Sequence, residues 1–126
     1  MEDDLKSYLL SGAALSALIG TRLYSEQFPP PAQQTLPSVV YTSEDADEEE
    51  LLDGSSSGLK SQVIRFTILG VSKITCVAVR KEIEALMTPP INSGVLRGAN
   101  WLSARSYHDY QSDKEVYEIV YNIFYA

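Results

Sequence analysis

The residues best suited to catalysis in this chain are its single histidine, His108, and its single cysteine, Cys76. Nucleophilic catalysis by Ser or Cys usually needs a histidine beside the nucleophile. His108 alternates in step with Leu102 and Ala104, as a strand histidine at the margin of a sheet does, and no nucleophile motif or set of metal ligands accompanies it. Cys76 lies on an apolar helical stripe, where a free cysteine behaves as a small hydrophobe. We therefore expect no catalytic residues and a protein that is not an enzyme.

A run of acidic residues is the second feature that could do chemistry, by holding a metal ion. Seven of the 17 Asp and Glu residues fall within positions 44–53, and they are Glu44, Asp45, Asp47, Glu48, Glu49, Glu50 and Asp53. Counted from Asp45, an EF-hand loop needs Gly at the sixth position and Glu at the twelfth, where this chain has Glu50 and Ser56. We expect no specific metal site, although loose binding of divalent cations by these carboxylates stays open.

Cofactor and sugar sites are not predicted either. The chain has no GxGxxG, P-loop or HExxH motif, and its glycines are too dispersed to cradle a phosphate. A glycosidase needs two acids fixed in a cleft, whereas these acids crowd one run. Most of the eight tyrosines lie after residue 100, where cross-strand packing explains them better than a platform for sugars or bases. An enzyme with a tyrosine-lined pocket is thus a disfavoured alternative.

The acidic run also carries the whole charge imbalance. The formal net charge is −7, and the chain outside the run holds 10 acidic and 10 basic residues. The bases are spread singly, so we expect no basic face that grips nucleic acid, although DNA could pass nearby without specific binding. The acidic start MEDDLK and the short apolar stretch 8–20 fit neither a secretory signal nor a membrane span. We expect a soluble protein made in the cytoplasm, with no membrane partner.

Two helical regions must position these residues. The first region begins with three acidic residues at positions 2–4, and Ser11 and Gly12 interrupt its helical pattern. Its apolar stripe is Leu5, Leu9, Ala13 and Ala17. Ser11 could cap a second short helix over 13–19, so we expect a kink or two pieces, closed at Gly20 by a left-handed C-cap. The second region starts at a cap on Ser72 and stops at Pro89 and Pro90, and its stripe is Cys76, Val79, Ile83 and Leu86.

Strand patterns occupy most of the remaining chain. Residues 37–43 and 61–70 are rich in β-branched and aromatic side chains, and alternation over 100–126 predicts a long hairpin with its turn at 112–114. Residues 44–60 between the first two strands combine the acidic run with a Gly- and Ser-rich segment. Such a segment buries too little apolar surface to order itself, so we expect a mobile loop there.

The element order α, β, β, α, β, β predicts one α+β domain over residues 1–126. We expect an antiparallel sheet of about four strands, two or three helices packed on one face, and the long loop between strands 1 and 2. The last strand carries Val116, Val120 and Phe124 on its second face, which is more apolar surface than solvent favours. We expect either the N-terminal helix or a neighbouring subunit to cover that face.

The same elements, taken in order, support a family resemblance. The chain contains LSGAALSALIGTRLY, then a proline-rich turn into LPSVVY, then QVIRFTILG, a helix from Ser72 and the closing VYEIVYNIFYA. In this order and spacing it resembles the tail-completion proteins of long-tailed bacteriophages, also called tail-terminator or head-to-tail joining proteins. The strongly acidic segment departs from that family, whose loops are generally shorter and less charged.

The resemblance implies a non-enzymatic structural protein of the virion, at the junction of head and tail. Such a protein acts as a ring of six that caps the tail-tube protein and meets the head-completion or connector protein, while genomic DNA passes through without specific binding. A closed ring needs two different complementary patches on each subunit, and the strand with Val116, Val120 and Phe124 is one candidate. The acidic loop would line the channel, reach the tube, or only aid solubility. The alternative is a small bacterial protein-binding module that recruits a peptide at a β-hairpin edge.

Overall fold

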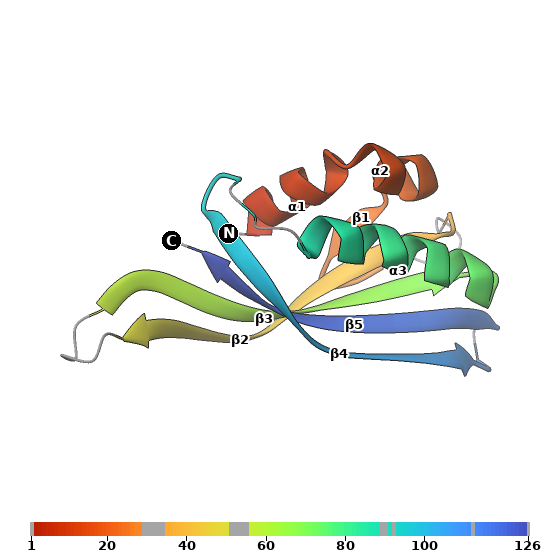
Figure 1. Ribbon diagram of the computed structural model, residues 1–126. Helices are drawn as coiled ribbons and strands as arrows, with labels where there is room; N and C mark the ends of the chain where they lie inside the picture. The colour runs from red at the N-terminus through yellow and green to blue at the C-terminus, as the bar shows by residue number, and fades with distance from the viewer. Residues whose placement is uncertain are drawn as a thin grey trace.

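The computed structural model describes residues 2–28, 35–50, 56–88, 91, 93–111 and 113–125. Its elements are α1 (Glu2–Leu10), α2 (Ala13–Ile19), β1 (Leu23–Ser25), β2 (Ser38–Glu50), β3 (Ser56–Gly70), α3 (Lys73–Met87), β4 (Leu96–Asp109) and β5 (Lys114–Tyr125). The strands form one sheet in the order β1-β2-β3-β5-β4. The three helices that the structure describes lie over one face of this sheet, and no described helix lies on the other face (Figure 1). The α+β fold with helices on one face is confirmed.

The sheet has one strand more than expected. The additional strand, β1, is the short extended segment that follows Gly20, and it runs parallel to β2, with Leu23 opposite Val39. Every other pair in the sheet is antiparallel. Arg22 holds this corner together, because its Nε donates to the carbonyl of Pro37 at 2.9 Å and its guanidinium donates to the carbonyl of Leu18 at 3.2 Å.

The N-terminal region forms two separate helices. The sequence predicted either a kinked helix or two pieces, and the second outcome is confirmed. The stripe, however, changes phase at the break, because Ala13 and Ala17 are exposed and Leu15 and Ile19 are buried instead. The predicted Ser11 cap is wrong. The N-cap of α2 is Gly12, which has no side chain to accept a capping hydrogen bond. The Ser11 hydroxyl instead donates to the backbone carbonyl of Tyr8 at 2.6 Å.

The predicted C-terminal end of α2 and the predicted ends of α3 are largely confirmed. Gly20 closes α2 with a positive φ of 61°, although its ψ of −121° lies outside the left-handed helical region. Ser72 is the N-cap of α3, and its hydroxyl accepts the backbone N–H of Thr75 at 3.3 Å. α3 ends at Met87, just before Pro89 and Pro90, which lie outside the described residues. None of the helices described is long and apolar enough to cross a membrane.

The core lies between the three helices and the helix-covered face of the sheet. Phe66 and Tyr121 meet edge to face there, with ring centroids 6.2 Å apart. The fully buried side chains at the centre of this layer are Leu5, Leu9, Leu15, Ile19, Leu23, Ile64, Phe66, Ile68, Ile83, Met87, Leu96 and Ile119. Burying a side chain of this size stabilises the fold by about 1.5–3 kcal/mol. The two layers are therefore held mainly by apolar packing.

The long mobile loop predicted over 44–60 is wrong in its bounds. β2 continues to Glu50 and β3 begins at Ser56, with Asp47 opposite Ser61 and Glu48 opposite Lys60. The backbone ladder continues because its hydrogen bonds join main-chain groups, whatever charge the side chains carry. Register shifts between Ser43 and Ala46 and between Glu48 and Glu50 mark irregular pairing in this part.

β2 and β3 continue past the body of the molecule as a two-stranded ribbon (Figure 1). The pairing of β3 with β5 reaches only as far as Lys60 opposite Tyr125, so nearer the tip β2 and β3 pair with each other alone. We call residues 44–50 of β2 and 56–60 of β3 the arm. Most of the acidic run thus lies on a strand, and Asp53 falls outside the described residues.

β4 begins at Leu96, earlier than the predicted start near residue 100, and it contains a bulge. Its register with β5 shifts between Trp101 and Ser103, so Leu102 is an extra residue and does not share the alternation of Ala104 and His108. Ala104 lies opposite Ile119, and His108 lies opposite Glu115. Sequence alternation alone cannot show such a bulge because it reports no cross-strand partner.

We predict that Gly94→Ala destabilises the protein by about 1–3 kcal/mol. Gly94 has φ 58°, and a Cβ there would collide with the carboxylate of Asp4, which accepts the backbone N–H of Val95 at 2.9 Å. Urea unfolding measures the loss. The matched control is Gly98→Ala, where a Cβ meets nothing within 4 Å. An equal change in both variants would contradict the role of the Asp4 contact.

Candidate interaction surfaces

The arrangement around His108 is an ion-pair cluster at the β4–β5 turn. His108 Nδ1 lies 2.7 Å from Glu115 Oε1, and His108 Nε2 lies 3.2 Å from Asp113 Oδ1. The hydrogen bond to Glu115 and the two carboxylate charges raise the pKa of His108 above its ordinary value, against a smaller opposing effect of burial. The ring also meets Tyr110 edge to face at 4.7 Å. The histidine thus has structural partners at a sheet margin, as expected from its strand position.

The Cys76 thiol lies near Glu115, the residue that also contacts His108, and it is not activated as a nucleophile. Cys76 is buried on the stripe predicted for α3, and its thiol lies 3.5 Å from the backbone carbonyl of Glu115. Burial, with a contribution from the charge of Glu115, raises the pKa of Cys76 to about 11. A reactive cysteine instead needs a lowered pKa and access to its substrate. Among the residues that the structure describes, no group of three or more His, Cys, Asp and Glu side chains could hold a metal ion.

The tyrosines of β5 pack against the core and α3. Arg80 of α3 stacks over the ring of Tyr117, with its guanidinium carbon 5.2 Å from the centroid. Burial raises the pKa of Tyr121 to about 12, with opposing contributions from Glu84 and Arg80. The expectation was cross-strand aromatic packing within the hairpin; Tyr121 instead meets Phe66 of β3, and Tyr117 meets Arg80 of α3.

The sheet face without helices carries a charged cluster that the sequence did not single out. Glu118 of β5 is only 7% exposed, although no helix covers it. Its Oε2 accepts hydrogen bonds from Arg65 of β3 and from Arg105 of β4, each at 2.8 Å, and Tyr107 donates to its Oε1 at 3.3 Å. Arg65 also donates to Glu44 at 2.6 Å. The cluster therefore ties the first acid of the run, three strands and the open face together.

Electrostatics keep Glu118 ionised. Burial alone would raise its pKa, but the hydrogen bond and charge of Arg105, together with Arg65, outweigh burial and hold the pKa of Glu118 below its ordinary value. The visible signal in the sequence is a charged residue at an open-face position of strands otherwise rich in apolar residues. Which arginines meet Glu118 depends on strand register, which the sequence does not report.

The candidate interface residues of β5 lie on the open face, and they are Val116, Val120 and Phe124. Glu118 lies between Val116 and the other two. Val116 is already 4% exposed, whereas Val120 and Phe124 are half-buried. Glu118 stands between the two valines, so the face alternates apolar and polar side chains. The N-terminal helices lie on the opposite face, which excludes them as the cover that was one of two expectations (Figure 1). A neighbouring subunit remains the predicted cover.

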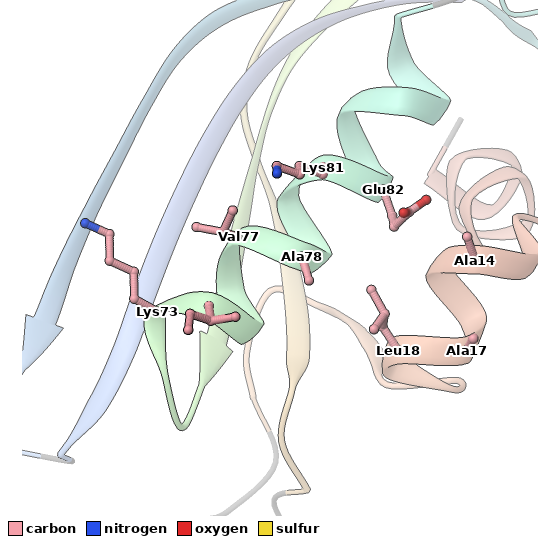
Figure 2. Close-up of a pocket in the computed structure, with 9 residues that line it drawn as sticks. Ala14, Ala17, Leu18, Lys73, Val77, Ala78, Lys81 and Glu82 are labelled. Atoms are coloured by element: carbon pink, nitrogen blue, oxygen red, sulfur yellow. The ribbon is translucent and has the colours of Figure 1, made fainter.

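A second surface is an apolar groove of about 780 Å³ between α2 and α3. Figure 2 shows Ala14, Ala17 and Leu18 of α2 on one side and Ala78 and Glu82 of α3 on the other, with Glu82 pointing towards α2. Ile74 at the groove is 82% exposed. Ala14 and Ala17 contribute here because the phase change at Gly12 turns them outward. The groove could receive an apolar side chain of a partner.

Comparisons with known proteins bear on the fold. No protein-family model matches the chain, and no curated protein matches its sequence. Among solved structures, the chain is similar to one in "Virion of native gene transfer agent (GTA) particle". The TM-score is 0.67 at 16% identity, and the similarity covers 99% of this chain and 93% of that chain. At this identity, the similarity establishes a shared fold over nearly the whole of both chains.

We predict that Glu118→Gln lowers the free energy of unfolding by about 1–3 kcal/mol at neutral pH. A carboxylate with a lowered pKa in the folded state stabilises the protein above its ordinary pKa of 4.5, and that contribution is lost as the pH falls through the folded pKa. The difference between variant and parent should therefore shrink below about pH 4.5 in urea unfolding.

Glu82→Gln is the control for the Glu118 variant, since it removes one charge from α3 on the other side of the sheet. We expect it to change stability little at any pH. Equal effects of the two variants would show that net charge, and not the arginine pair, is responsible.

Proposed function

We propose that this protein is a structural component of a phage-like particle, the tail terminator that caps the tail tube and joins it to the head connector as a ring of six. The observation that supports this best is the fold shared with a chain of a gene transfer agent virion over nearly the full length of both chains. Fold alone does not establish function. The resemblance of the ordered sequence segments to tail-completion proteins is the second, independent support.

The surfaces of the molecule suit an assembly role better than catalysis. The described residues around His108 and Cys76 form a histidine–carboxylate hydrogen bond and a buried thiol with a raised pKa. In contrast, one face of the sheet, the α2–α3 groove and the arm are open to partners. In this role the partners are further copies of the chain, the tail-tube protein and the head-completion or connector protein.

The arm could face either of two places in such a ring. If it lines the channel, six copies of an acidic ribbon repel DNA phosphates, so the genome passes without specific binding. If it lies at the end face of the ring, it would instead bind a basic surface of a partner. Its strand structure favours a projecting contact element over a solvated loop that only aids solubility.

The outer edge of β4, which pairs with no strand among the described residues, supports a second candidate function. A long edge strand with exposed apolar side chains can accept an extended peptide as a further strand. On this alternative the protein is a small bacterial binding module outside any virion.

Immunogold electron microscopy of particles from the producing host, with antibody against this chain, separates the two functions. We expect gold clustered at the junction of head and tail, because a tail terminator is retained in the finished particle. Particles from a strain in which this gene is deleted are the labelling control. The antibody is first validated on purified protein. Complete absence of gold from intact particles would contradict the virion role and favour the peptide-binding module.

A further inference from the structure

The outer strand β4 has an unusually open edge. In the part of the chain that the structure describes, β4 has β5 on one side and no strand on the other. Its middle portion is exposed, with Trp101 at 55%, Leu102 at 49% and Tyr107 at 43%. The outward N–H and C=O groups of such a strand form a template for another strand.

Natural proteins usually protect a long edge strand with charges, prolines, β-bulges or a covering loop. β4 has one of these devices, the bulge at Leu102. Between Trp101 and Tyr107, the only charged residue is Arg105, whose side chain is 65% exposed. The strand is also 14 residues long, well above the usual length of about 5–6. Both features are expected of an edge that is covered in the assembled state.

The arm offers a second open edge of opposite character. β1 pairs with β2 only from Val39 to Tyr41, so over residues 44–50 no described strand lies on that side of β2. The sequence places Glu44 and five further acids on this stretch, and they are Asp45, Asp47, Glu48, Glu49 and Glu50. Seven residues of strand span about 23 Å, which fits along part of β4.

We propose that the arm of one copy pairs edge to edge with β4 of a second copy, so that neighbouring sheets join head to tail. This inference rests on the ring in the proposed function and names the two surfaces that would close it. Two arms cannot pair well with each other, because like charges directly opposite on neighbouring strands are destabilising. The arm therefore favours an edge with apolar side chains and no acidic ones, such as β4 between Trp101 and Tyr107, over a second arm. Arg105 on this stretch is already paired with Glu118.

The choice of edges determines the symmetry. Two copies of β4 that pair with each other would form a two-fold dimer and stop. Pairing of β4 with an arm uses two different surfaces on each copy, and such a heterologous contact forms a ring where the rotation between neighbours closes. The acidic run thus acts as a specificity element against the closed dimer.

Pairwise cysteine crosslinking tests the contact in the full chain. Glu49→Cys marks the arm and Leu102→Cys marks β4, and a short bismaleimide is added to each variant alone and to their mixture at millimolar concentration. The native Cys76 is buried, so the parent protein reports background. We expect several-fold more crosslinked dimer in the mixture than in either variant alone.

Lys81→Cys on exposed α3 replaces the β4 marker in the matched control mixture, and Ser103→Cys is a second β4 marker if Leu102→Cys does not fold. A mixture yield no higher than with Lys81→Cys overturns the proposal. The proposal is also overturned if Leu102→Cys alone gives as much crosslinked dimer as its mixture with Glu49→Cys, because β4 of one copy then pairs with β4 of another.

Charge removal tests the specificity step. Adding Glu48→Gln and Glu50→Gln to the Glu49→Cys arm should lower its yield with β4 several-fold and raise arm-to-arm crosslinking. Unchanged yields would overturn the role of the acids.

The outcomes stay separate from those of the virion test. Gold at the head–tail junction without crosslinking means a virion protein that uses another interface. Crosslinking without gold means head-to-tail assembly outside a virion.

Discussion

One-sided burial of the sheet is the constraint on which the rest of the structure depends. Three helices pack their apolar stripes onto a single face, where Phe66, Ile119 and Tyr121 form the centre of the core. A chain of 126 residues has enough apolar surface for one such layer pair. Among the described residues, no helix covers the other face and no strand pairs with the outer edge of β4. The packing that stabilises the fold therefore uses only one face of the sheet.

The open face is stabilised in a different way from the core. Glu118 is buried there under Arg65, Arg105 and Tyr107, because long side chains can cover a sheet face while their charged ends pair above it. This cluster joins β3, β5 and β4 across their register, and Glu44 extends it to the base of the arm. The same charged network thus connects β4 to the base of the arm.

Local patterns predicted those elements whose formation depends on nearby residues. The α3 stripe of Cys76, Val79 and Ile83 is buried as predicted, and Ser72 caps the helix, because both depend on residues within one or two turns. At the end of the stripe, Met87 is fully buried and the predicted Leu86 only partly. Predictions failed where a distant contact decides the outcome. The helix break at Gly12 moved burial from Ala13 to Leu15, and a bulge removed Leu102 from its alternation. The acidic run formed a strand because β3 supplies main-chain partners to it.

By itself, the sequence determined the α+β class, the order of the elements except the short strand β1, the place of Cys76 on the buried stripe of α3, and the location of the charge imbalance. These follow from periodicity and composition, which act over a few neighbouring residues. Only the tertiary structure decided that the acids from Glu44 to Glu50 lie on a projecting strand, that Glu118 meets Arg65 and Arg105, and that β4 is an outer strand of the sheet that the structure describes. Such features arise from strand register and sheet order, which depend on how residues far apart in the chain pair in space.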